Sequence, residues 1–254
     1  MRFQGRVALI TAAGRGIGRA TAEIIGREGG TVVAVDRDKA AVEDVAGAIR
    51  AAGGAADAIV ADGLDAPQVD DVVRRAVDAH RRIDILVNAV GGSTIIGKPA
   101  AAVEELSLAE WQELLDFNLK GTFLFLHAVV PVMKRQRAGK IVNLSSIAGR
   151  GLSPSSSSAY ATAKGGIIAL TRKLSLELGP HGITVNAIAP SLTLSPRLRP
   201  RWDAMSADEQ AREVERVPLR RIAQPEDQAR VICFLASADA DFVTGVTIDV
   251  TGGQ

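Results

Sequence analysis

Short apolar runs rich in β-branched residues alternate with longer helical segments along most of the chain, and this alternation limits the fold more than any other feature. Seven runs have the length and composition of buried strands: RVALIT, TVVAV, AADAIVA, IDILVN, KIVNLS, ITVNAIA and VTIDV. Segments between them, such as GRATAEIIGREG and APQVDDVVRRAVDAHRR, have the spacing of amphipathic helices. Parallel strands need such right-handed crossovers on both faces. The pattern predicts an α/β fold, a doubly wound parallel sheet of about seven strands.

Length and charge limit the organisation and the partners. A chain of 254 residues can bury one substantial core, so we expect a single domain over residues 1–254. Lys and Arg number 30 against 29 Asp and Glu, which leaves no basic field to attract nucleic acid or an anionic membrane. No signal-peptide pattern and no apolar run long enough for a bilayer are present, so the predicted location is cytoplasmic.

Cysteine and histidine usage argues against a disulfide and a metal centre. The single cysteine, Cys233, lies on an apolar helix face and is expected in the core. His80, His127 and His181 are far apart in sequence and lack the spacing of metal ligands. We therefore expect no catalytic metal.

A glycine-rich turn, TAAGRGIG, joins the first predicted strand to the first predicted helix. A helix N-terminus offers free N–H groups and a positive dipole end, and it holds a pyrophosphate when small residues let the backbone approach. The residues expected at this contact are Gly14, Arg15, Gly16, Ile17 and Gly18. The turn predicts a dinucleotide site of the Rossmann type.

Asp36 ends the next predicted strand, about twenty residues beyond the turn, where a carboxylate can accept hydrogen bonds from both ribose hydroxyls and repel a 2′-phosphate. This favours NAD over NADP. Arg37 keeps the alternative open, because its guanidinium could pair with that phosphate or simply be a solvated turn residue. Ala12 adds a methyl group to the turn, which is tolerable unless the position needs a positive φ or very close approach of the cofactor.

Tyr160 and Lys164 are four residues apart in SAYATAK and share one face of a predicted helix. A phenol is a poor base at neutral pH, but a neighbouring ammonium stabilises the phenolate and lowers its pKa. By itself such a pair is common on helices, and a packing role is the alternative.

The motifs taken together, in their order along the chain, resemble the short-chain dehydrogenase/reductase family over essentially the whole chain. Its TGxxxGxG turn is represented by TAAGRGIG, its NNAG element by NAVG and its YxxxK pair by Tyr160 with Lys164. Further positions that match are Asp62 with Gly63 in VADGLD, Asn88 in NAVG, Asn118 in FNLKG, Ser146 after GKIVNLS, and Pro190, Ser191, Thr193 and Ser195 in APSLTLS. The resemblance implies that these residues, apart from Asn118 and Ser146, contact the cofactor.

The resemblance also implies a reaction, in which a hydride passes between a nicotinamide and a carbon that bears a hydroxyl or carbonyl oxygen. Tyr160 would be the general acid/base on that oxygen, and Ser146 would hydrogen-bond it. Lys164 would lower the pKa of the tyrosine and bind the nicotinamide ribose, while Asn118 would position a water of the proton relay. The choice of Ser146 over the adjacent Ser145 rests on the family pattern.

Four departures from the family pattern affect the cofactor side. Ala12 and Ser191 replace usual glycines, Ala89 with Val90 replaces the usual Asn-Ala, and Ser195 stands at the usual threonine. None of them touches the four catalytic positions.

The segment 191–221 is predicted to be a substrate lid. It contains Trp202 and the arginines Arg197, Arg199, Arg201, Arg216, Arg220 and Arg221, which could receive an anionic substrate or be merely solvated. Two long segments, 108–136 and 159–179, are apolar around most of their circumference, which favours a homo-oligomer, dimer or tetramer.

The predicted function is hydride transfer between NAD(H) and a small-molecule secondary alcohol, diol or ketone. The alternative is an NADP-dependent 3-oxoacyl thioester reductase. A non-catalytic nucleotide-sensing protein on the same fold is the remote alternative, because a fold does not establish a function.

Overall fold

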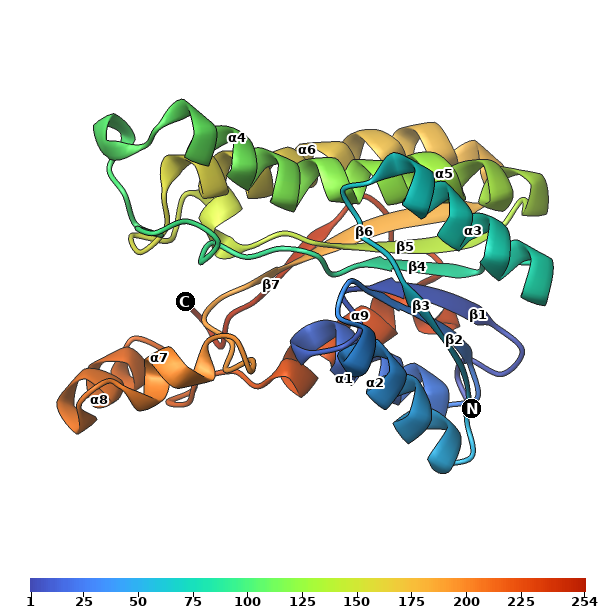
Figure 1. Ribbon diagram of the computed structural model, residues 1–254, viewed down its shortest axis with the longest axis horizontal. Coiled ribbons are helices and arrows are strands. Elements are labelled where there is room, and N and C mark those ends of the chain that lie inside the picture. Colours follow the sequence, from blue (N-terminus) through green and yellow to red (C-terminus); the bar gives the residue numbers. More distant parts are fainter.

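Seven parallel strands form one sheet in the computed structural model, which describes residues Met1–Gln254 (Figure 1). The strands are β1 (Val7–Thr11), β2 (Thr31–Asp36), β3 (Ala55–Val60), β4 (Ile85–Asn88), β5 (Gly139–Leu144), β6 (Ile183–Pro190) and β7 (Thr247–Val250). Their order in the sheet is β3-β2-β1-β4-β5-β6-β7. Every predicted strand is present, and the predicted doubly wound parallel sheet is confirmed.

Helices cover both faces of the sheet (Figure 1). They are α1 (Gly16–Arg27), α2 (Lys39–Ala51), α3 (Ala66–His80), α4 (Leu108–Leu115), α5 (Gly121–Gln136), α6 (Ser158–Leu178), α7 (Arg199–Asp203), α8 (Ala207–Glu215) and α9 (Pro225–Ala236). A π-helical turn, η2 (Asp116–Lys120), joins α4 to α5. Short 3₁₀ turns are η1 (Val103–Glu105), η3 (Ile147–Arg150), η4 (Gly179–His181) and η5 (Ala238–Ala240).

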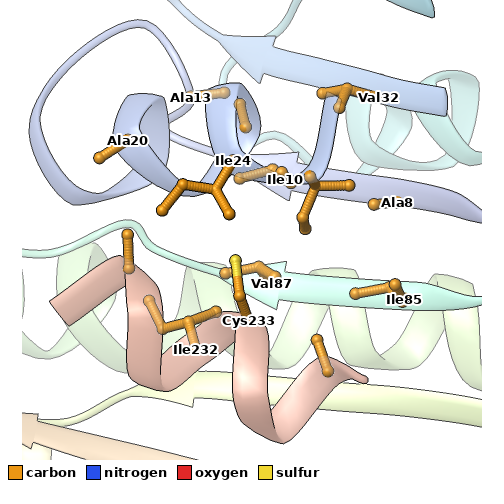
Figure 2. Packing of buried hydrophobic residues seen from close by; sticks show 14 of the residues in the cluster. Ala8, Ile10, Ala13, Ala20, Ile24, Val32, Ile85, Val87, Ile232 and Cys233 are labelled. Atoms are coloured by element: carbon orange, nitrogen blue, oxygen red, sulfur yellow. The ribbon is translucent and has the colours of Figure 1, made fainter. Parts of the chain in front are cut away.

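Alternating side chains of the strands build two cores, one on each side of the sheet. On β1, Ile10 faces a cluster of 26 buried residues shared with α1, α2 and α9, whereas Leu9 faces a cluster of 21 shared with α3 and α5. Figure 2 shows Ile10 and Val87 packed between α1 and α9. Burying each such side chain stabilises the fold by about 1.5–3 kcal/mol.

Cys233 lies in the first of these cores, as expected, on the inner side of α9 (Figure 2). Burial raises the pKa of its thiol to about 12, so the group stays protonated and unreactive at neutral pH. None of the helices combines the length with the apolar character needed to cross a bilayer.

The segment between β6 and α9 leaves the sheet at the carboxyl ends of the strands, and α7 and α8 project beyond that end (Figure 1). It has a small apolar cluster of its own, in which Leu194, Val217 and Ile222 are buried and Trp202 packs against them. Ser206 accepts a hydrogen bond from the backbone of Glu209 and thereby caps α8.

Candidate active site

A cleft of about 570 Å³ opens at the carboxyl ends of the strands, where the strand order reverses between β1 and β4. Fifteen of the residues singled out from the sequence line it: Arg15, Gly16, Ile17, Gly18, Asp36, Arg37, Asp62, Gly63, Ser146, Tyr160, Lys164, Pro190, Ser191, Thr193 and Ser195. The other three, Gly14, Asn88 and Asn118, are not part of its wall.

The glycine turn leaves the first N–H groups of α1 open to the cleft. The helix begins at Gly16, which has φ +56°, and its N-cap residue Arg15 makes no side-chain capping hydrogen bond. A Cβ on Gly18 would lie 2.2 Å from the carbonyl oxygen of Ala12, so only glycine permits this approach of helix to turn. Uncapped N–H groups at a helix N-terminus form a site for a phosphate.

Ala12 adopts the left-handed conformation, with φ +49°. The condition stated from the sequence is therefore met: the position needs a positive φ, and the methyl group of the alanine places strain on the backbone there.

Asp36 is fixed at the end of β2 by two backbone donors. Its carboxylate accepts hydrogen bonds from the N–H groups of Gly14 and Asp38, both at 3.0 Å. Gly14 therefore does not line the cleft itself, but its backbone N–H holds the Asp36 carboxylate in place. Arg37 is exposed and forms no ion pair, whereas Arg15 pairs with Asp38 at 2.5 Å.

The side chains of Asp62 and Asn88 form hydrogen bonds at the carboxyl ends of β3 and β4. Asp62 accepts a hydrogen bond from the N–H of Leu64 at 3.0 Å, which shapes the turn after β3. Asn88 is buried, and its amide donates to the side-chain oxygen of Asn143 at 2.9 Å, which ties the end of β4 to β5. Its position behind the wall thus supports the strand ends that form the cleft.

Tyr160 and Ser146 meet in the cleft, one from the first turn of α6 and the other from the end of β5. Burial raises the pKa of the Tyr160 phenol, while a hydrogen bond with Ser146 and the charge of Arg197 lower it. The hydroxyl of the neighbouring Ser145 is buried and donates to the carbonyl of Lys164 at 2.8 Å. Both serines line the cleft, and the hydroxyl of Ser145 is engaged with the backbone of α6.

Lys164 lies one turn after Tyr160 with its ammonium 5.9 Å from the centre of the ring. It is almost fully buried, donates to the carbonyl of Leu144 at 2.8 Å, and burial lowers its pKa to about 7. Burial is the largest cause acting on both groups: it raises the pKa of the phenol and lowers that of the amine.

Asn118 sits in the π-helical turn between α4 and α5 and is fully buried. Its side-chain oxygen accepts the N–H of Gly92 at 2.9 Å, and its amide donates to the carbonyls of Gly92 at 3.1 Å and Leu114 at 3.0 Å. The side chain therefore holds the loop after β4 in place, and π-helical turns of this kind are frequent at functional sites.

Several wall residues were not identified as site residues from the sequence. They include Gly91, Gly92, Thr94 and Phe117, and Arg197 had been considered only as part of the lid. A Cβ on Gly91 would lie 2.5 Å from the Lys164 ammonium, so this glycine permits the close packing of the loop on the catalytic helix. Two adjacent glycines after a strand were the available signal.

The cleft fits a nicotinamide dinucleotide. It offers a glycine turn for the diphosphate, a carboxylate for a ribose and an acid/base pair at the other side. No group of three or more His, Cys, Asp and Glu side chains is arranged to hold a metal ion.

Known proteins are similar in sequence to this chain over nearly its full length. A family model described as enoyl-(acyl carrier protein) reductase matches residues 11–254. The short-chain reductase protein NovJ of Streptomyces niveus is 40% identical over 99% of this chain and 94% of its own. The 3-oxoacyl-[acyl-carrier-protein] reductase FabG of Thermotoga maritima is 38% identical over 100% of this chain and 99% of its own.

Solved structures agree with these relatives. Levodione reductase superposes with a TM-score of 0.92 at 33% identity, over 100% of this chain and 98% of its own. A 3-oxoacyl-[acyl-carrier protein] reductase with bound NAD from Brucella melitensis gives a TM-score of 0.88 at 36% identity, over 99% of this chain and 93% of its own. With this fold, this cleft and these relatives, the chain belongs to the short-chain dehydrogenase/reductase family of nicotinamide-dependent oxidoreductases.

Proposed function

We propose that the protein transfers a hydride between NAD(H) and a secondary alcohol, diol or ketone. One observation carries this proposal: Ser146, Tyr160 and Lys164 converge in the same cleft that holds the glycine turn and Asp36. A reacting carbon placed beside Tyr160 can therefore lie next to a dinucleotide anchored at the turn.

In the direction of reduction, the phenol of Tyr160 donates its proton to the carbonyl oxygen of the substrate, and in oxidation the phenolate accepts the hydroxyl proton. Ser146 donates a hydrogen bond to the same oxygen and orients it. The dinucleotide supplies or accepts the hydride when it is bound. Lys164, when protonated, stabilises the phenolate and binds the ribose next to the nicotinamide.

The proton relay beyond Lys164 passes by Asn118. The amide of this residue is already engaged with Gly92 and Leu114, so its side chain is held in place beside the relay. That assignment gives the side chain a positioning role.

The preference for NAD rests on Asp36. Two backbone donors hold its carboxylate at the cleft, where it accepts the ribose hydroxyls of NAD and repels the 2′-phosphate of NADP. Arg37 is exposed beside it and free of an ion pair, which is the observation that favours the second candidate below.

The second candidate is an NADP-dependent 3-oxoacyl thioester reductase. Two relatives have names that refer to acyl thioesters: FabG of Thermotoga maritima, and the (2S)-[(R)-hydroxy(phenyl)methyl]succinyl-CoA dehydrogenase subunit BbsD of Thauera aromatica, 38% identical over 100% of this chain and 98% of its own. Arg37 would pair with the 2′-phosphate in this case.

A substrate panel separates the two candidates. Secondary alcohols, diols, ketones and a 3-oxoacyl thioester are offered with each cofactor, and the nicotinamide absorbance is followed. We expect kcat/KM to be at least about tenfold higher with NAD(H) than with NADP(H), on alcohols or simple ketones. Asp36→Ala should reduce this ratio, and Arg37→Ala should not. Turnover confined to the thioester with NADPH would establish the second candidate instead.

A further inference from the structure

Arg197 lies two residues before α7, in the turn that follows β6, and its side chain lines the cleft. Its guanidinium donates to the carbonyl of Gly91 at 2.9 Å and lies 5.9 Å from the ring centre of Phe117. A Cβ on Gly92 would lie 1.8 Å from the same guanidinium, so the glycine makes room for it. The side chain thus crosses from the lid to the opposite wall.

The other arginines of segment 191–221 do not share this position. Arg216 pairs with Glu213 at 2.6 Å, and Arg221 pairs with Asp227 at 2.5 Å. Arg199 donates to the side-chain oxygen of Gln224 at 3.4 Å, and Arg220 donates to the backbone carbonyl of Glu215 at 2.8 Å. Arg201 and Arg212 are exposed and, like these four, do not line the cleft.

Arg197 lies between the two ends of the cleft. Burial lowers the pKa of its guanidinium. The charges of Tyr160 at one end of the cleft and Asp36 at the other raise this pKa, and the charge of Arg37 lowers it. The backbone just before it packs on the phosphate-binding turn, because a Cβ on Gly16 would lie 3.3 Å from the Cβ of Ser195 and 4.0 Å from the Cδ of Pro196. The guanidinium itself lies against Gly91 and Gly92, and the two residues before it border the glycine turn.

A charge in this place faces one particular part of a dinucleotide. With a ribose at Asp36 and the nicotinamide at Tyr160, the diphosphate that joins the two halves lies at the turn between them. Arg197 has no carboxylate partner, and a carbonyl oxygen is a weaker acceptor than a phosphate oxygen. A guanidinium can bind two phosphate oxygens at once.

We propose that Arg197 is a diphosphate clamp: it exchanges the Gly91 carbonyl for the diphosphate of the bound dinucleotide and so ties the lid to the cofactor. The clamp rests on the dinucleotide binding of the proposed function, not on its substrate. The same chemistry would suit an anionic group on the substrate, and the experiment separates the two.

The test compares Arg197→Met with Arg201→Met, a lid arginine outside the cleft. Dissociation constants for NADH and for ADP-ribose, which has the diphosphate but no nicotinamide, are measured by cofactor fluorescence and by calorimetry. We expect Arg197→Met to weaken both ligands by about 10- to 100-fold, the usual consequence of losing a charge-assisted hydrogen bond. Arg201→Met should leave both unchanged, and Arg197→Lys should keep part of the affinity.

Two further measurements test whether the effect depends on the charge of Arg197 and whether the variant is folded. Raising the salt from about 0.05 to about 0.5 M should weaken NADH binding more steeply in the unchanged protein than in Arg197→Met. The thermal midpoint without ligand should be the same in both, which excludes a folding defect.

Unchanged affinity of Arg197→Met for NADH and ADP-ribose would overturn the clamp. If that variant instead loses only the binding of carboxylate compounds to the NADH complex, the guanidinium serves the substrate and the clamp is also wrong. A failure of the proposed function looks different, because it appears in the unchanged protein as absent turnover.

Discussion

The hydroxyl of Tyr160 is the proposed general acid/base of the cleft, which it lines together with Ser146. Removing it in Tyr160→Phe leaves the ring and its packing in place. We expect the turnover number to fall at least about 100-fold, in the range lost with a general acid/base. Cofactor affinity, measured by NADH fluorescence, should stay within about threefold, because the proposed anchors of the dinucleotide, the glycine turn and Asp36, are unchanged.

Tyr160 is the only tyrosine in the chain, so its ionisation can be followed directly by phenolate absorbance, with Tyr160→Phe as the blank. Burial raises the pKa of this phenol, and the absorbance step should therefore come at higher pH than for a free tyrosine. A fully active Tyr160→Phe would remove the tyrosine from the mechanism.

At the scale of single residues, the sequence predicted which side chains line the cleft better than how they interact. The glycine turn and Asp36 follow from the topology, because the carboxyl ends of parallel strands meet at one edge, whereas the residues after β3 and β6 came from the family resemblance. The choice between Ser145 and Ser146 and the low pKa of Lys164 depend on burial and on backbone partners, which no spacing encodes.

Among the elements, α1 approaches the turn after β1 so closely that Gly18 cannot carry a side chain. The Cβ of Gly18→Ala would lie 2.2 Å from the Ala12 carbonyl oxygen and 2.9 Å from its carbon, so backbone must move. We expect the free energy of unfolding to fall by about 1–3 kcal/mol, as in overpacked sites, and NADH binding to weaken. Urea denaturation and fluorescence titration measure the two effects.

Gly47→Ala is the matched control, since Gly47 is within α2 and a Cβ there meets no atom within 4 Å. It should raise the free energy of unfolding by about 0.5–1 kcal/mol, because alanine is the better helix former. A Gly18→Ala variant as stable as the unchanged protein would mean that α1 is not held at this distance.

The elements themselves follow from the sequence wherever periodicity is strong. All seven strands match the predicted runs to within one residue beyond either end, because buried parallel strands read as continuous apolar stretches. The segment 108–136 looked like one helix, and the π-helical turn at 116–120 within it was missed because one extra residue per turn leaves the apolar pattern almost unchanged. In the lid, Ser206 and Glu209 were an available signal for α8 that was not used.

For the molecule as a whole, the parallel sheet accounts for the position of the site. Its strand order reverses between β1 and β4, so the connections on the two sides diverge and leave a cleft at their carboxyl ends. Helix α6 and the segment 191–221 both contribute residues to that cleft, although the strand β6 separates them in the sequence. Ser195 of the lid lies beside the glycine turn. In the proposed clamp, cofactor binding and the position of the lid are therefore coupled.

Exposed apolar side chains on the outer helices are the remaining feature of the whole molecule. Phe123 on α5 is 50% exposed and Leu176 on α6 is 65% exposed, although both helices already bury one face against the sheet. Apolar surface of this kind on a water-facing helix is typical of a subunit contact. We expect light scattering at micromolar concentration to report a homo-oligomer, and Phe123→Glu or Leu176→Glu to yield a smaller species, since a buried unpaired charge opposes association. Val60→Glu, at the exposed end of the edge strand β3, is the control and should leave the mass unchanged; a monomeric unchanged protein would contradict the expectation.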